Sequence, residues 1–155
     1  MASYNQFGEP LWINARIALA RLGYDPPDKI GPHSADQILD DMWLQYAPQQ
    51  FGENAPTWDE LVEAERLVLL DDAKERRIKR LRRVTSDRIT AAYGAVDRDD
   101  ELNIRLRLAH TLAQDEERER IVAKYKEIRD MINGKKTESG IHEIDFDSED
   151  LWTAP

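Results

Sequence analysis

The sequence predicts an all-α protein with two short N-terminal helices, a long antiparallel helical hairpin, and extended N- and C-terminal arms. Glycine and proline are confined to a few segments, and the long stretches between them repeat apolar residues at helical spacing. The 155 residues suffice for one domain with arms but not for two full-sized cores. We therefore divide the chain into residues 1–56 (arm and two helices), 57–134 (hairpin) and 135–155 (acidic tail).

The first short helix is expected over residues 10–22. It follows an N-terminal arm of residues 1–9 and begins at Pro10, whose missing N–H costs nothing in the first turn of a helix. Gly23 is typical of a residue just beyond a helix end. A loop over residues 24–33, rich in proline, is expected to follow.

The second short helix is expected to begin at Ser34 and to end before Pro48. Ser34 and Gln37 have the spacing of a capping box, in which each side chain bonds the other residue's backbone N–H. Of the tryptophans, Trp12, Trp43 and Trp58 fall on the apolar faces of predicted helices and are expected in the core.

The hairpin begins with the strongest helix signal in the chain. Thr57 and Glu60 form a second capping box, and no glycine or proline occurs from residue 58 to 93. Gly94 closes this run, while Thr85 and Ser86 leave open a kink or a break into two helices.

A second long helix is expected from the acid-rich start at Asp97 to Gly134, with a solvated stretch or hinge over 113–120 where the apolar pattern lapses. A short turn over 94–97 joins the two helices, which implies an antiparallel hairpin with arms of roughly 50 Å. Such a hairpin buries only a narrow seam. Oligomerisation or docking to a larger body is therefore expected.

Charge is unevenly distributed. The chain has a net charge of −9. Residues 61–94 form a basic stretch with 6 acids and 9 bases, whereas residues 138–155 form an acidic tail with 6 acids and no base. Phosphate repels an acidic protein at long range, so we do not expect nucleic acid as the main partner. Segregated charge suits docking between protein subunits.

The candidate partner-binding residues lie in the basic stretch and in the tail. The basic stretch encircles its helix, so a solvated face, docking onto an acidic partner and phosphate binding all stay open, in that order of preference. Its most obvious partner is the acidic tail of the same chain or of a neighbouring copy. In that tail a short strand is expected over 141–146, and large apolar side chains are expected to anchor an interface. The candidates are Arg76, Arg80, Arg83, Phe146, Leu151 and Trp152.

No pattern in the sequence indicates catalysis, a cofactor or a metal. There is no cysteine, no glycine-rich phosphate loop and no nucleophile elbow. The histidines His33, His110 and His142 lack metal-ligand spacing. The acids from Asp97 to Glu101 lack the central glycine of a calcium loop. We expect a non-enzyme, without a secretory signal or a transmembrane span.

Residues 88–95, Arg-Ile-Thr-Ala-Ala-Tyr-Gly-Ala, follow an arginine-rich helix, and Glu101-Leu102 with Arg105 and then Tyr125-Lys126 come after them. This pattern, over about residues 75–135, resembles small tail-associated structural proteins of tailed bacteriophages. The resemblance implies a virion part made in the host cytoplasm. It would bind other virion proteins in the tail, baseplate, fibre-attachment or neck region, as a trimer or another ring-compatible multimer. It supplies no site residues.

Two alternatives stay open. One is a tail-assembly chaperone that is absent from the mature particle. The other is a cytoplasmic helical regulator that binds nucleic acid through the stretch from Arg76 to Arg88.

Overall fold

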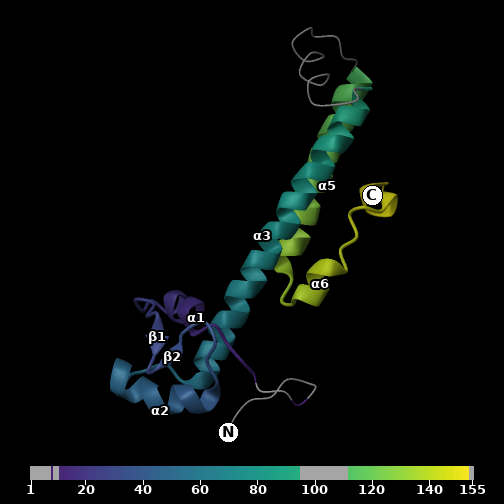
Figure 1. Ribbon diagram of the computed structural model, residues 1–155. Helices are drawn as coiled ribbons and strands as arrows, with labels where there is room; N and C mark the ends of the chain where they lie inside the picture. The colour runs from purple at the N-terminus through teal and green to yellow at the C-terminus, as the bar shows by residue number, and fades with distance from the viewer. Residues whose placement is uncertain (1–7, 9–10, 95–111, 154–155) are drawn as a thin grey trace. The chain divides into compact units, whose positions relative to one another are not determined.

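A computed structural model describes residues 8, 11–94 and 112–153, and it confirms a mostly helical fold (Figure 1). Its elements, in chain order, are α1 (Ala15–Arg21), β1 (Lys29–Ile30), β2 (His33–Ser34), α2 (Asp40–Phe51), α3 (Trp58–Ala92), α5 (Leu112–Gly134), α6 (Glu138–His142) and α7 (Glu149–Thr153). The chain divides into two compact units, residues 1–71 and 72–155, and the boundary falls within the sequence of α3. The sequence-based boundaries at 56 and 134 lie just before the start of α3 and at the end of α5.

Helix α1 begins at Ala15, five residues later than predicted. Asn14 is extended, with φ −87° and ψ 95°, and its side-chain oxygen accepts a hydrogen bond from the Ile17 N–H at 3.3 Å. This N-cap satisfies a donor that the first turn leaves without a helical partner, so it determines where the helix starts.

The residues before α1 pair with the strand-like segment before α2. The Ile13 N–H donates to the Ile38 carbonyl at 3.0 Å, and the Ile38 N–H donates back at 2.9 Å. Because neighbouring residues of an extended chain point to opposite faces, Ile13 is buried while Trp12 is 49% exposed. The prediction that Trp12 lies in the core was wrong, whereas Trp43 and Trp58 are buried as expected.

The loop predicted over 24–33 contains a two-stranded antiparallel hairpin. Lys29 pairs with Ser34 and Ile30 with His33, around a turn of Gly31 and Pro32. Gly31 has φ +59°, and a Cβ atom there would lie 2.5 Å from the ring of Tyr46. Only glycine satisfies both the backbone conformation and the close approach of the ring.

Helix α2 begins at Asp40 rather than Ser34, which lies in β2, and it continues through Pro48 instead of ending before it. Pro48 has no N–H to donate to the carbonyl one turn earlier, yet three further helical residues follow it. Gly52, with φ +80°, ends the helix and donates its N–H to the Pro48 carbonyl at 3.1 Å.

One apolar core holds the first unit together. Trp43 is its largest fully buried side chain, and its indole N–H donates to the Pro56 carbonyl at 2.9 Å. Its ring packs against Phe51 with centroids 5.5 Å apart. The buried members of this core are Ile13, Ala15, Ala18, Leu19, Ile30, Ala35, Ile38, Trp43, Ala47, Trp58, Leu61 and Ala64.

Helix α3 is continuous over 35 residues, which answers the question that the sequence left open. The predicted capping box is confirmed: the Thr57 N–H donates to Glu60 Oε2 at 2.8 Å, and the Glu60 N–H donates to Thr57 Oγ1 at 3.2 Å. Thr85 does not break the helix, because its buried hydroxyl donates to the Leu81 carbonyl one turn earlier at 2.8 Å.

Within the second unit α3 and α5 lie side by side (Figure 1), and their contacts show that they run antiparallel. Lys74 Nζ donates to the carbonyl of Asn133 at 2.9 Å. Tyr93 Oη, near the far end of α3, donates to Asp115 Oδ1, near the start of α5, at 2.9 Å. Residues 113–120 are helical within α5. The predicted turn over 94–97 and the start of the second helix, up to residue 111, fall outside the described residues.

The C-terminal segment, residues 135–153, contains two short helices, and the short strand expected over 141–146 is absent from it. Thr137 caps α6 by accepting a hydrogen bond from the Gly140 N–H at 3.0 Å. Four of its apolar side chains are buried: Ile141, Ile144, Phe146 and Trp152. The described part of this arm is therefore folded onto the chain's own helices.

Candidate functional site: the arginine-rich face of helix α3

Three arginines of α3 face the C-terminal segment, and we call Arg77, Arg80 and Arg88 the arginine row. An α-helix turns about 100° per residue, so the eleven residues from Arg77 to Arg88 complete three turns. Arg77 and Arg88 therefore point the same way, and Arg80 lies beside them. The basic stretch encircles the helix as expected, but these three positions share one face.

Arg77 contacts both an aromatic ring and a backbone carbonyl of the C-terminal segment. The Arg77 guanidinium carbon lies 4.2 Å from the centre of the Phe146 ring, and Arg77 Nη2 donates to the Ile144 carbonyl at 2.7 Å. A cation over an aromatic face is attracted to the ring's electrons, more strongly where water is excluded. Phe146 is fully buried, so this contact is largely dry.

Arg88 repeats the arrangement further along the helix. Its guanidinium carbon lies 4.6 Å from the centre of the Trp152 ring, and its two terminal nitrogens donate to the Glu149 carboxylate at 3.1 and 2.9 Å. These hydrogen bonds, and then the charge of Arg88, lower the pKa of the Glu149 carboxyl from its ordinary value. Between the two stacked arginines, Arg80 pairs with Asp147 at 2.7 Å.

The end of the segment is also bound by a residue of α5 and by a hydrogen bond within the segment. Arg120 Nη1 donates to the Trp152 carbonyl, and Arg120 also pairs with Glu117 at 2.7 Å. The hydrogen bonds that Arg120 donates to the Glu117 carboxylate raise the pKa of Arg120 from its ordinary value. The Trp152 indole N–H donates to the Phe146 carbonyl at 2.7 Å, which closes a loop between the two aromatic anchors.

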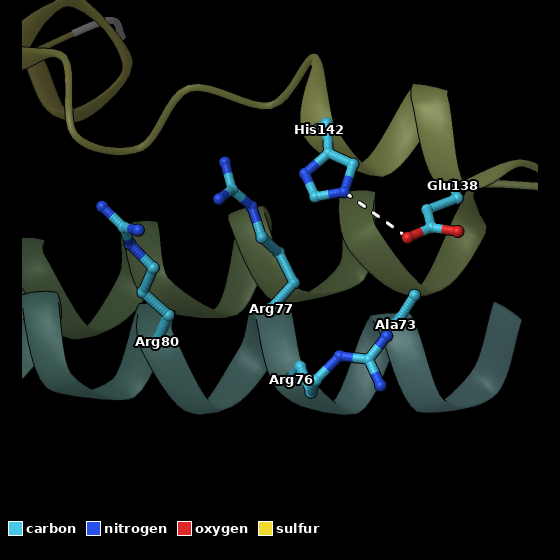
Figure 2. A pocket seen from close by; sticks show the side chains of 6 residues that line it. All are labelled: Ala73, Arg76, Arg77, Arg80, Glu138 and His142. Carbon is cyan, nitrogen blue, oxygen red and sulfur yellow. Dashed lines mark ion pairs between the residues drawn. The ribbon is translucent and has the colours of Figure 1, made fainter. Parts of the chain in front are cut away.

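Beside this contact lies a cleft of about 190 Å³ (Figure 2). Its lining residues are Ala73, Arg76, Arg77 and Arg80 of α3, and Glu138 and His142 of α6. In Figure 2 the Arg77 and Arg80 side chains rise from α3 towards the C-terminal segment, while Arg76 extends along α3. His142 Nε2 lies 3.7 Å from Glu138 Oε1, and both side chains are more than half exposed. The cleft thus has three guanidinium groups and one carboxylate.

The structure brings some of the predicted site residues together. Arg76 and Arg80 line the same cleft, whereas Arg83 is exposed and is not among its lining residues. Phe146 and Trp152 are fully buried, so they anchor the tail to the chain's own helices in this structure. Leu151 is half-buried and lines a separate, open groove of about 600 Å³ with Met131. The expectation that the acidic tail contacts the basic stretch is confirmed within one chain.

Sequence reasoning missed Arg77, Arg88 and Arg120 as site residues, although each binds the C-terminal segment. The eleven-residue spacing of Arg77 and Arg88 was the available signal for the first two. For Arg120 the sequence offered none, because its position against Trp152 depends on how α5 pairs with α3.

Among the residues that the structure describes, no group of histidines and carboxylates could hold a metal ion. No helix in the described ranges combines the length and the apolar character needed to cross a membrane. Comparison of the chain with protein-family models, with curated proteins and with solved structures found no significant match.

Proposed function

We propose that this chain is a non-enzymatic structural adaptor of a bacteriophage particle, which joins larger virion proteins through helical packing. The phage setting comes from the resemblance of residues 75–135 to tail-associated proteins. The support for a binding role is the exposed apolar surface of the chain itself. In the setting of a particle, the adaptor would be present in several symmetric copies in the tail, baseplate, fibre-attachment or neck region.

The observation that carries the binding role is apolar surface on the first unit. The exposed fraction is 59% for Leu44, 48% for Leu69 and about half for Trp12. Leu44 also lines a groove of about 250 Å³ together with Trp43, Pro56 and Trp58. Covering large, water-exposed apolar side chains with another protein lowers the free energy, so such side chains favour binding. Tryptophan is a frequent interface anchor.

Mass spectrometry of purified particles tests the proposal. The chain should be found in mature particles at a fixed ratio to a neighbouring protein. A particle that lacks it would contradict the adaptor role and would favour the tail-assembly chaperone.

A surface variant sharpens the same test. Leu44→Asp places a charge on the exposed apolar surface without removing a core residue, so it should lower incorporation into particles. Glu53→Gln, an exposed change on another residue lining the same groove, is the matched control and should be incorporated normally.

A further inference from the structure

The cleft between α3 and α6 contains guanidinium groups whose hydrogen-bonding capacity is only partly used. Arg76 has no hydrogen bond or ion pair to any residue that the structure describes. The Nε atom of Arg77 is buried and has no hydrogen-bond partner in the described part of the chain. Arg80 uses one terminal nitrogen for Asp147. A guanidinium has five N–H donors, so Arg76 and Arg80 keep donors for a further acceptor, while the buried Arg77 Nε adds only positive charge beside them.

The C-terminal segment shows which ligand this face of α3 accepts. Each carboxylate that reaches the arginine row is bound at hydrogen-bonding distance: Asp147 at 2.7 Å from Arg80, and Glu149 at 2.9 Å from Arg88. The planar guanidinium matches the geometry of a carboxylate, which can accept two parallel hydrogen bonds. Arg76 and Arg77 are the part of this face that receives no carboxylate from the segment.

We infer that this cleft binds carboxylate side chains from an acidic segment of a partner protein, with Arg76 as the main contact and Arg77 and Arg80 beside it. This inference rests on the proposed adaptor function and names the partner chemistry of one of its surfaces. Glu138, the one carboxylate among the lining residues, opposes binding and limits the affinity. His142 lies beside Glu138 at the same edge of the cleft.

The surroundings of the cleft favour a short acidic peptide over nucleic acid. The C-terminal segment places six acidic residues between 138 and 150, and it packs directly beside the arginines. Duplex DNA carries a negative charge about every 1.7 Å, so a bound duplex would extend over those acids. One or two carboxylates entering a cleft of about 190 Å³ avoid most of that repulsion.

Fluorescence anisotropy with a labelled hexaglutamate peptide, at low salt and with the full chain, tests the inference. Arg76→Gln should weaken binding by roughly 3- to 10-fold, the range expected for a charge-assisted hydrogen bond at a partly exposed site. The matched control is Lys79→Gln, which removes the same charge from an exposed position of α3 outside the cleft. It should change binding by less than about 2-fold.

A second variant tests the sign of the effect without removing an arginine. Glu138→Gln removes the carboxylate that lines the cleft, so it should strengthen binding of hexaglutamate by about 2- to 3-fold. The Arg Nε–H signals of the wild-type chain, followed by NMR during the same titration, should shift for Arg76 and Arg77 and stay in place for Arg83.

Three results would overturn the inference. They are equal losses in Arg76→Gln and Lys79→Gln, no hexaglutamate binding at low salt, and tighter binding of a short DNA duplex than of hexaglutamate at the same salt. The two proposals fail separately. A chain absent from particles that still binds hexaglutamate through Arg76 leaves the cleft assignment standing, and a chain present in particles without such binding leaves only the adaptor role.

Discussion

The first unit and the C-terminal segment are stabilised by different forces. In the first unit, twelve buried apolar residues form one cluster, and its ion pairs, such as Arg21 with Asp71, lie at the surface. In the C-terminal segment, both aromatic anchors are covered by a guanidinium group, Phe146 by Arg77 and Trp152 by Arg88. Salt and pH act on charges far more than on apolar burial. They should therefore loosen the segment and leave the first unit folded.

The largest effect is expected in the apolar core. Trp43→Ala removes the largest fully buried side chain of the first unit and the hydrogen bond to Pro56, so it should lower the free energy of unfolding by about 3–5 kcal/mol. Denaturant unfolding, followed through the NMR signals of residues 11–71, measures this change. Leu44→Ala, at the exposed neighbouring position, should stay within about 0.5 kcal/mol. Equal losses in the two variants would show that burial is not what stabilises this unit.

Trp152→Ala should release the C-terminal segment and leave α3 and α5 helical. The indole is fully buried, stacks on Arg88 and bonds the Phe146 carbonyl, so its removal takes away three contacts at once. Limited proteolysis should cut within residues 143–153 much faster than in the wild type, while the helical circular dichroism changes little. Leu151→Ala, one residue away and half-buried, should have a clearly smaller effect. Faster cleavage in the first unit would contradict a local release.

A smaller effect is expected at the hairpin of the first unit. Gly31→Ala forces a side chain into a left-handed conformation, which costs about 1–2 kcal/mol, and it also displaces the Tyr46 ring. Gly23→Ala is a close control, because Gly23 also has a positive φ, +89°, but has no atom within 4 Å of the added Cβ. Thermal unfolding should show the larger loss for Gly31. A larger loss for Gly23 would contradict the role assigned to the Tyr46 ring.

The smallest effect concerns pH. Because Arg88 lowers the pKa of Glu149 in the folded chain, the Glu149 contact stabilises the docked segment above the ordinary carboxyl pKa of about 4.3 and is lost as pH falls through the lowered value. The Trp152 indole N–H signal should report this loss between pH 6 and pH 3. In Glu149→Gln the corresponding part of the titration should disappear. An unchanged titration in that variant would assign the transition to another group.

The long helices could be predicted from the sequence, and the start of the first helix could not. The Thr57 and Glu60 capping box and the absence of glycine and proline after it are local signals, and α3 follows them. Ser34 and Gln37 have the same spacing, yet Ser34 lies in β2, since the Ile13–Ile38 pairing and the Gly31 turn place that stretch in extended conformation. Tertiary contacts over more than twenty residues decided against the local pattern.

The candidate site shows the same limit. The charges of the basic stretch and of the acidic tail are visible in the sequence, and their attraction could be predicted from it. Which arginines contact the tail depends on how α7 and the loop before it are aligned along α3. In the observed alignment Phe146 and Trp152 are both buried, each under an arginine side chain, and the charges alone do not specify it.

The double use of Arg77 and Arg88 has a consequence for how the sequence can diverge. Each guanidinium covers a ring with its flat face and donates N–H groups from its edge, to Ile144 in one case and to Glu149 in the other. A lysine ammonium carries the same charge but has no flat face to stack on a ring while it donates sideways. Homologous chains with this fold should therefore exchange arginine and lysine freely at position 79. Positions 77 and 88 should keep arginine unless the aromatic residue that each one covers is also substituted.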